Sequence, residues 1–249
     1  MDKNRFANQV AVVTGAATGL GKAITLRLAL EGARVVALDL DGAAAERAAA
    51  EIGGGALARQ VDVADEASVQ RALDWTRTQV GAPSIMVNSA GIAGPTSTPI
   101  VNYSTSDFDR VCAVNLRGSF LMTKYVLPAM LERNYGRILL IASMAGKDGN
   151  PGMCGYSASK SGVIGLVKGI GKEYAETGIR VNGLAPAVIM TDMVHKLPAE
   201  TVSYMTAKIP MKRCGTLEEV AAMSAWIVSA ECSFSTGFVF DLSGGRATY

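Results

Sequence analysis

The stretch VAVVTGAATGLG, residues 10–21, decides the fold. Its first five residues are apolar or β-branched, which is typical of a strand buried on both faces. Gly15, Gly19 and Gly21 follow, and an amphipathic helical pattern runs over 21–30. A strand, a glycine turn and a helix in this order bring the backbone close to a pyrophosphate and aim the helix N-terminus at it. The stretch therefore predicts a dinucleotide-binding unit, although its spacing T-G-x-x-x-G-x-G differs from G-x-G-x-x-G.

Short apolar runs alternate with longer helical patterns along the rest of the chain. Strands are expected at 10–14, 34–38, 56–61, 84–88, 137–142, 179–184 and 237–242. Helices are expected at 21–30, 41–51, 65–79, 106–132, 155–176 and 216–229. This order predicts an α/β protein with a Rossmann-like, doubly wound parallel sheet of about seven strands and helices on both faces. A single domain over 1–249 is expected, and the unpatterned connection 186–216 is interpreted as a lid over the substrate site.

Composition narrows the function classes. The chain is 49% hydrophobic and 18% charged, which excludes a disordered protein. Lys plus Arg number 24 against 22 acidic residues, without a long run of one sign, so neither nucleic acid nor a membrane surface is expected as a partner. The single histidine, His195, excludes a multi-histidine metal site, and no metal is predicted. Four scattered cysteines and a polar segment 1–9 without a signal peptide predict a cytoplasmic protein.

Asp39 indicates which nucleotide is bound. It ends the second expected strand, 18 residues after Gly21. A carboxylate at this point can accept hydrogen bonds from both ribose hydroxyls of adenosine, and it would repel a 2′-phosphate. No Arg or Lys lies inside the glycine turn to offset that repulsion. The cofactor is therefore predicted to be NAD rather than NADP.

A second group of residues is predicted to transfer the proton and hold the substrate. Tyr156 and Lys160 are four residues apart and lie on one helix face. An ammonium beside a phenol favours the phenolate and lowers the pKa of the phenol, which suits proton transfer near neutral pH. Ser143 follows an expected strand, at the edge where doubly wound sheets bind ligands, and its hydroxyl is a candidate to hold the substrate oxygen.

The ordered set of motifs resembles the short-chain dehydrogenase/reductase family over essentially the whole chain. The residues that carry the resemblance are T-G-x-x-x-G-x-G at 14–21, Asp39, Asp62-Val63, Asn88-Ser89-Ala90-Gly91, Asn115, Ser143, Tyr156-x-x-x-Lys160 and 186–191. Two positions depart from the family pattern. Ser89 stands where the family usually has Asn, and Ala187 stands where it usually has Gly.

The resemblance implies roles for these residues. Tyr156 would be the general acid/base and Lys160 would bind the nicotinamide ribose. Ser143 would orient the reacting oxygen, and Asn115 would hold a water that connects Lys160 to solvent. The residues implied to contact the cofactor are Gly15, Thr18, Gly19, Leu20, Gly21, Asp39, Leu40, Asp62, Val63, Asn88, Ala90, Gly91, Tyr156, Lys160, Pro186, Val188, Ile189 and Thr191.

The sequence gives fewer signals for the substrate than for the cofactor. Lys147 and Arg246 are candidates to bind a carboxylate, and Met153 is a candidate to line the pocket. The stretch from Gly149 to Arg213 is similar to bacterial sugar-acid dehydrogenases of the family, which oxidise 2-keto-3-deoxy sugar acids at C4. The favoured reading is thus an NAD-dependent oxidoreductase that moves a hydride between nicotinamide and a secondary alcohol or ketone of such an acid.

Two other functions stay open. One is an NADPH-dependent 3-oxoacyl-thioester reductase, because such enzymes have a similar sequence. That function would require NADPH and a basic patch for an acidic carrier protein. Asp39 and a net charge of only +2 argue against both requirements. A non-catalytic NAD-sensing scaffold is the alternative of another class, although Ser143, Tyr156 and Lys160 are all present.

A homotetramer is the expected assembly. Gly162, Gly165 and Gly169 form a stripe on the helix of Tyr156, and such helix-weakening residues are understandable where another element packs very close. The resemblance implies a tetramer built through this helix, the 106–132 helix and the last strand. In tetramers of this family the C-terminal tail, which is residues 244–249 in this sequence, can reach the active site of another subunit.

Overall fold

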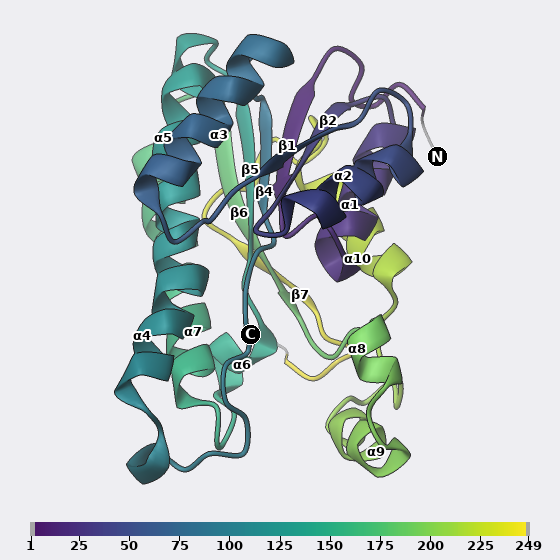
Figure 1. Cartoon of the computed structure of the whole chain (residues 1–249), viewed down its shortest axis with the longest axis vertical. Helices are drawn as coiled ribbons and strands as arrows, with labels where there is room; N and C mark the ends of the chain where they lie inside the picture. The colour runs from purple at the N-terminus through teal and green to yellow at the C-terminus, as the bar shows by residue number, and fades with distance from the viewer. Residues whose placement is uncertain (1–2, 248–249) are drawn as a thin grey trace.

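In the computed structural model, which describes residues 3–247, seven parallel strands form one sheet in the order β3-β2-β1-β4-β5-β6-β7 (Figure 1). The strands are β1(Val10–Thr14), β2(Arg34–Asp39), β3(Leu57–Gln60), β4(Ile85–Asn88), β5(Gly136–Ile141), β6(Ile179–Pro186) and β7(Val239–Leu242). All strand predictions are confirmed within two residues at either end. The doubly wound parallel sheet is also confirmed.

The longer helices lie where the sequence predicts them. They are α1(Gly19–Leu30), α2(Gly42–Ile52), α3(Glu66–Gln79), α4(Thr105–Cys112), α5(Gly118–Glu132), α7(Cys154–Glu173) and α10(Leu217–Ile227). Aspartates begin two of them: Asp41 caps α2 by accepting from the Ala44 N–H at 2.9 Å, and Asp65 caps α3. Thr216 and Glu219 form a reciprocal capping box at the start of α10.

Helices cover the sheet on both faces. Figure 1 shows α3, α5 and α7 on one face and α1, α2 and α10 on the other. Successive strand residues point to opposite faces, so each strand feeds two cores. Val12 belongs to the core under α5 and α7, whereas its neighbour Val13 belongs to the core under α1 and α10. Both faces are buried, and this explains why the strands are continuous apolar runs.

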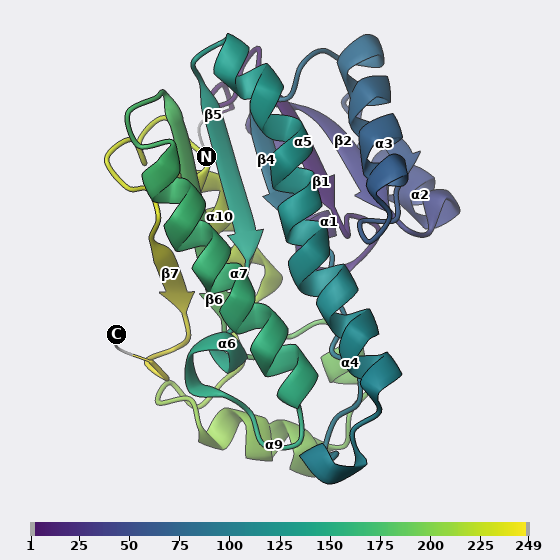
Figure 2. The same cartoon turned by 90° about the vertical axis from the view of Figure 1, so that its left-hand side faces the viewer.

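The strand order reverses between β1 and β4, which lie side by side at the centre of the sheet. Crossovers to either side of such a switch point leave a crevice at the carboxyl ends of the strands. The small helices α6(Met144–Asp148), α8(Asp192–His195) and α9(Ala199–Ala207) lie beyond these carboxyl ends, as Figure 1 shows and Figure 2 shows again for α6 and α9. The arrangement gathers the sequence motifs at one end of the molecule.

The expected helix over 106–132 is wrong in one respect, because it contains a π-helical turn, η2(Ala113–Arg117), between α4 and α5. The turn widens around Asn115, whose side chain bonds outside the helix. The segment 186–216 contains α8 and α9, which the sequence did not indicate. Neither helix buries a residue, so neither has an apolar stripe to detect. No helix within residues 3–247 has the length and apolar character that crossing a membrane requires.

Candidate active site

The glycine turn between β1 and α1 is built by close approaches that only glycine permits. A Cβ atom on Gly15, which has a φ of +64°, would lie 2.9 Å from the backbone nitrogen of Ala90. A Cβ atom on Gly21 would overlap the Gly15 carbonyl oxygen, well inside 3.0 Å. At Gly19, by contrast, the nearest atom is the Thr191 methyl carbon at 3.9 Å. Gly15 and Gly21 therefore pack tightly against backbone atoms, whereas the space next to Gly19, toward Thr191, is open.

Asp39 lies at the carboxyl end of β2, beside the turn. Its carboxylate accepts the N–H of Ala17 at 3.0 Å and the N–H of Asp41 at 3.1 Å. The side chain is half-buried, with one oxygen toward the glycine turn and the other toward the start of α2. Asp39 is thus held in place by backbone N–H groups of the glycine turn and of the segment that leads into α2.

Asn88 ends β4, next to the segment that contains Ala90 and Gly91. It is buried and joins the central strands: its Oδ1 accepts from the Thr14 hydroxyl at 2.7 Å, and its Nδ2 donates to the Ser119 hydroxyl at 3.0 Å. The Thr14 oxygen in turn accepts the N–H groups of Ser89 and Ala90, both at 3.1 Å. Asn88 braces the backbone under the site, and Ala90 and Gly91 form the surface above it.

Asn115 is fully buried in the π-helical turn. Its Oδ1 accepts the Ile92 N–H at 2.8 Å, and its Nδ2 donates to the Ile92 carbonyl at 3.0 Å and to the Ser159 hydroxyl at 3.0 Å. The amide thereby ties the turn to the segment after β4 and to helix α7. Three hydrogen bonds thus fix the Asn115 side chain next to helix α7.

Lys160 is the buried cation of the cluster, with 4% of its surface exposed. Its ammonium donates to the Ile141 carbonyl at 2.7 Å, and burial lowers the pKa of the side chain to about 8. A Cβ atom on Gly91 would lie 3.1 Å from Asn115 Oδ1 and 3.4 Å from Lys160 Nζ. A side chain at this position would therefore crowd both the amide and the ammonium, and glycine leaves room for them.

The lowered pKa predicts how Lys160 affects stability. In the unfolded chain the ammonium titrates near its ordinary value of 10.5, so between pH 8 and 10.5 the unfolded state binds more protons than the folded state. Below pH 8 the buried charge costs about 3 kcal/mol, partly offset by about 1 kcal/mol from its hydrogen bond. We expect Lys160→Met to raise the free energy of unfolding of the cofactor-free protein by about 2 kcal/mol at pH 7, and this gain to vanish above pH 10.

Denaturant titrations of the two proteins at several pH values measure this difference. Lys168→Met is the matched control, because Lys168 lies exposed on the same helix. A gain at Lys160 that does not change with pH, or a loss of stability at pH 7, would contradict the prediction.

Ser143 and Tyr156 meet beside this cluster. Ser143 follows β5 and caps α6, where its hydroxyl accepts the Ala145 N–H at 3.1 Å. Burial raises the pKa of Tyr156, and a hydrogen bond with the Ser143 side chain acts in the opposite direction. Lys160 does not lower the pKa of Tyr156 as the sequence predicted. Its Nζ lies 5.8 Å from the centre of the Tyr156 ring and donates to the Ile141 carbonyl.

The remaining predicted cofactor residues lie around the same crevice. Thr18 and Leu20 flank Gly19 in the turn, and Leu40 is 64% exposed just after Asp39. Asp62 accepts the Ala64 N–H at 2.9 Å, and Val63 beside it is buried. Across the crevice, Pro186 ends β6, and Val188 and Ile189 pair with Gly215 before Thr191 caps α8. The structure thus places the predicted cofactor residues at the carboxyl ends of β1, β2, β3, β4 and β6, in the segments that follow them, and on α7.

The predicted substrate residues lie at the other end of the crevice, each with a partner from the same chain. Lys147 forms an ion pair with Asp241 at 2.8 Å, and Arg246 forms one with Asp148 at 3.0 Å. Met153 precedes helix α7, and its sulfur lies 3.9 Å from Asn150 Nδ2. Sequence reasoning missed these acidic partners, because Asp241 and Asp148 lie 94 and 98 residues from the cations that they bind.

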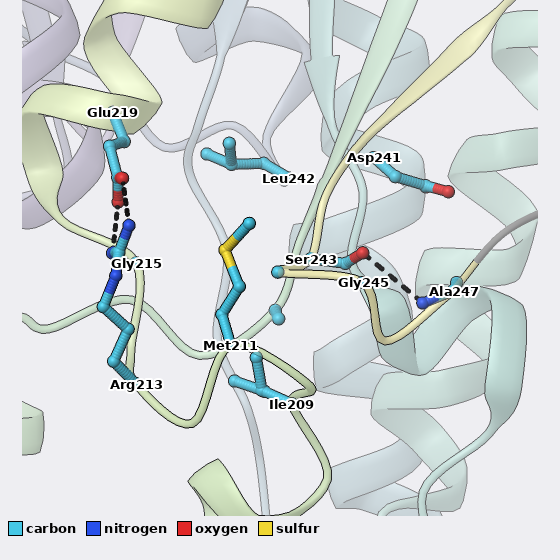
Figure 3. Close-up of a pocket in the computed structure, with 12 residues that line it drawn as sticks. Ile209, Met211, Arg213, Gly215, Glu219, Asp241, Leu242, Ser243, Gly245 and Ala247 are labelled. Atoms are coloured by element: carbon cyan, nitrogen blue, oxygen red, sulfur yellow. Dashed lines mark hydrogen bonds and ion pairs between the residues drawn. The ribbon is translucent and has the colours of Figure 1, made fainter.

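A cavity of about 390 Å³ lies between the end of β7 and the segment Ile209–Gly215 (Figure 3). The side chain of Met211 points into it, and an ion pair between Arg213 and Glu219, at 2.6 Å, closes one side. Neither Ser143, Tyr156 nor Lys160 lines the cavity. Residues 3–247 also contain no cluster of His, Cys, Asp and Glu able to hold a metal ion.

Comparisons with known proteins agree with this geometry. Residues 9–201 match the sequence model of the short chain dehydrogenase family. The chain is 44% identical to a 2-dehydro-3-deoxy-L-rhamnonate dehydrogenase (NAD(+)) of Sphingomonas sp. (strain SKA58), over 98% of both chains. It is 38% identical to the (3R)-3-hydroxyacyl-CoA dehydrogenase of Rattus norvegicus, over 97% of both chains. It is also 39% identical to a 3-oxoacyl-(acyl-carrier-protein) reductase of Synechocystis sp., over 97% of this chain and 98% of that one.

The match covers the glycine turn, Asn115, Ser143, Tyr156 and Lys160, which the fold gathers at one edge of the sheet. The chain belongs to the short-chain dehydrogenase family.

Proposed function

We propose that this oxidoreductase uses NAD to oxidise a 2-keto-3-deoxy sugar acid at C4. The observation that carries the substrate class is the 44% identity, over 98% of both chains, to a protein named for such an activity. Gly15, Gly19 and Gly21 form the phosphate turn, and the lid segment 186–216 closes over the substrate. All of this lies in a single domain.

The residues present fit a nicotinamide dinucleotide. The open space above Gly19 suits a pyrophosphate at the N-terminus of α1, because a Cβ there meets nothing nearer than 3.9 Å. An ammonium has three N–H donors, and the Ile141 carbonyl takes one from Lys160, which leaves donors for the two ribose hydroxyls. The Asp39 carboxylate favours an adenosine ribose without a 2′-phosphate.

The catalytic side chains divide the proton chemistry among them. Bound nicotinamide supplies the hydride acceptor. The Ser143 hydroxyl donates to the reacting oxygen and orients it beside Tyr156. In oxidation Tyr156 passes its own proton toward solvent and takes the proton of the alcohol, and in reduction it returns a proton to the substrate oxygen. Lys160 holds the ribose, and Asn115 places the water that carries the proton from Lys160 to solvent.

NAD⁺ reduction followed at 340 nm tests the proposal. We expect turnover with 2-keto-3-deoxy-rhamnonate or -fuconate, and with NAD⁺ in preference to NADP⁺. Steroids, polyols and simple hydroxy acids serve as comparison substrates in the same screen. Efficient reduction of 3-oxoacyl thioesters with NADPH, and no turnover of sugar acids, would replace this function with the alternative named by the reductase relative. Failure to turn over any substrate while binding NADH would favour the non-catalytic scaffold.

We further propose a cytoplasmic homotetramer built through α5, α7 and β7. Exposed apolar side chains lie on α5 and just before β7: Phe120 of α5 is 46% exposed, and Phe238, which precedes β7, is 56% exposed. The glycine stripe is only partly packed within the chain. A Cβ on Gly162 would lie 2.8 Å from Leu116, whereas on Gly165 or Gly169 it would meet no described atom within 4 Å. Gly165 and Gly169 are thus available to a second copy, and light scattering should give the mass of four chains rather than one.

A further inference from the structure

Two ion pairs of opposite polarity connect α6 with the C-terminal part of the chain. Lys147 of α6 binds Asp241 of β7, and Asp148 of α6 binds Arg246 of the tail. Both cationic side chains are 12% exposed, so each pair is largely withdrawn from water. Removing one partner of such a pair leaves a poorly solvated charge, and this makes the contacts sensitive to substitution.

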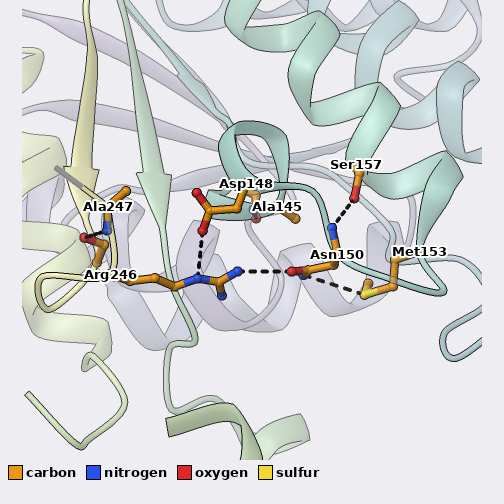
Figure 4. A network of polar contacts seen from close by, with 9 residues as sticks. Ala145, Asp148, Asn150, Met153, Ser157, Arg246 and Ala247 are labelled. Atoms are coloured by element: carbon orange, nitrogen blue, oxygen red, sulfur yellow. Dashed lines mark hydrogen bonds and ion pairs between the residues drawn. The ribbon is translucent and has the colours of Figure 1, made fainter. Parts of the chain in front are cut away.

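The Arg246 guanidinium also reaches the α6–α7 loop, residues 149–153. Its Nε donates to Asp148 Oδ2 at 3.0 Å and its Nη2 donates to Asn150 Oδ1 at 3.1 Å (Figure 4). The Asn150 N–H in turn donates to the Ser157 hydroxyl at 3.0 Å. Ser157 is the neighbour of Tyr156, so a continuous chain of polar contacts runs from the tail to the catalytic helix.

The described part of the tail also contacts the lid segment. The Gly244 carbonyl accepts the Met211 N–H at 3.1 Å. Gly244 has a φ of +59°, and a Cβ there would lie 2.6 Å from the Ile209 side chain. The tail thus touches the lid segment on one side and the α6–α7 loop on the other. Thr248 and Tyr249, the last two residues of the tail, lie outside the described residues.

We propose that Arg246 is a positioning residue that fixes the α6–α7 loop between Ser143 and Tyr156, rather than a residue that contacts the substrate carboxylate. The loop joins Ser143, which caps α6, to Tyr156 on α7, and it carries Met153. The planar guanidinium is suited to this task, because it presents adjacent donors to Asp148 and Asn150 at the same time. The kinetic part of this inference rests on the proposed function.

The first test compares three variants with the sugar acid as substrate. Arg246→Gln should raise KM about tenfold while the affinity for NADH stays unchanged, because the glycine turn is not involved. Asp148→Asn should also raise KM, since it removes the negative charge from the same contact. The double variant Arg246→Asp with Asp148→Arg should recover part of the loss, because it restores the ion pair with reversed polarity.

Direct binding of the substrate carboxylate by Arg246 predicts a different pattern. Asp148→Asn would then leave KM unchanged or lower it, and the double variant would stay as poor as Arg246→Gln. Either result overturns the proposal. Arg77→Gln is the matched control, because Arg77 pairs with Asp74 on the exposed surface of α3 and should leave KM unchanged.

Hydrogen exchange of the cofactor-free protein tests, without any substrate, whether Arg246 fixes the α6–α7 loop. Arg246→Gln should speed exchange in peptides that cover residues 149–157, where the Asn150 N–H is bonded, and should leave β1 and β4 unchanged. Unaltered exchange at 149–157 overturns the proposal even if every kinetic prediction holds. Faster exchange in a protein without sugar-acid turnover supports the positioning role and refutes only the proposed substrate.

Discussion

Replacing Tyr156 by phenylalanine should lower kcat about a thousandfold, within the range that a positioned general acid or base contributes. The ring remains in its half-buried place, so the variant keeps its fold and loses only the hydroxyl next to Ser143. Steady-state NAD⁺ reduction and NADH fluorescence titration, measured on the same preparation, separate the loss of chemistry from a loss of cofactor binding.

Tyr174→Phe is the control for this experiment. Tyr174 is the residue just after the same helix, and its ring packs against the core beneath it. We expect its removal of a hydroxyl to leave kcat within about threefold, since surface substitutions change free energies by less than about 0.5 kcal/mol. Full activity in Tyr156→Phe would show that another group moves the proton.

Replacing Gly21 by alanine produces the second large effect. By helix propensity alone this change should stabilise α1 by about 1 kcal/mol. The structure predicts the reverse, because the new methyl group would overlap the Gly15 carbonyl, a backbone group that cannot rotate aside as a flexible side chain does. Overpacking of this kind costs up to about 3 kcal/mol of stability. If the turn shifts to relieve the overlap and the lost pyrophosphate contacts weaken binding by a similar free energy, NADH affinity falls about a hundredfold.

Calorimetric titration with NADH and a thermal melt measure the two consequences. Ala23→Gly, on the same helix, is the matched control. It should cost about 1 kcal/mol of stability through helix propensity and leave NADH affinity unchanged. If Gly21→Ala bound NADH as well as the parent chain, the close approach between the turn and α1 would not be needed for cofactor binding.

The parts of this molecule that sequence could predict are those encoded locally. The strands were visible because burial on both faces demands continuous apolar runs such as VAVVT. Asp39 was visible because its place depends only on the end of β2. Tyr156 and Lys160 were paired correctly on one helix, since their spacing alone sets that geometry.

The rest depends on contacts between distant segments. The π-helical turn follows from hydrogen bonds between Asn115 and Ile92, 23 residues away, and no local pattern signals them. The direction of the pKa change at Tyr156 depends on burial and on the partner that Lys160 selects. The role of Arg246 changed for the same reason, because its acidic partner lies 98 residues earlier.

The central position of β1 has a consequence for how the chain is made. Every strand pairing is parallel, so no two neighbours form a hairpin that could assemble locally. Thr14 and Asn88, which end the two middle strands, are 74 residues apart. During synthesis the apolar strand β1 therefore emerges long before its neighbour β4 exists. Topologies of this kind fold slowly, and until they are complete they expose unpaired strand edges that are prone to aggregate. Slower translation or chaperone supply should thus raise the soluble yield more than any stabilising surface mutation would.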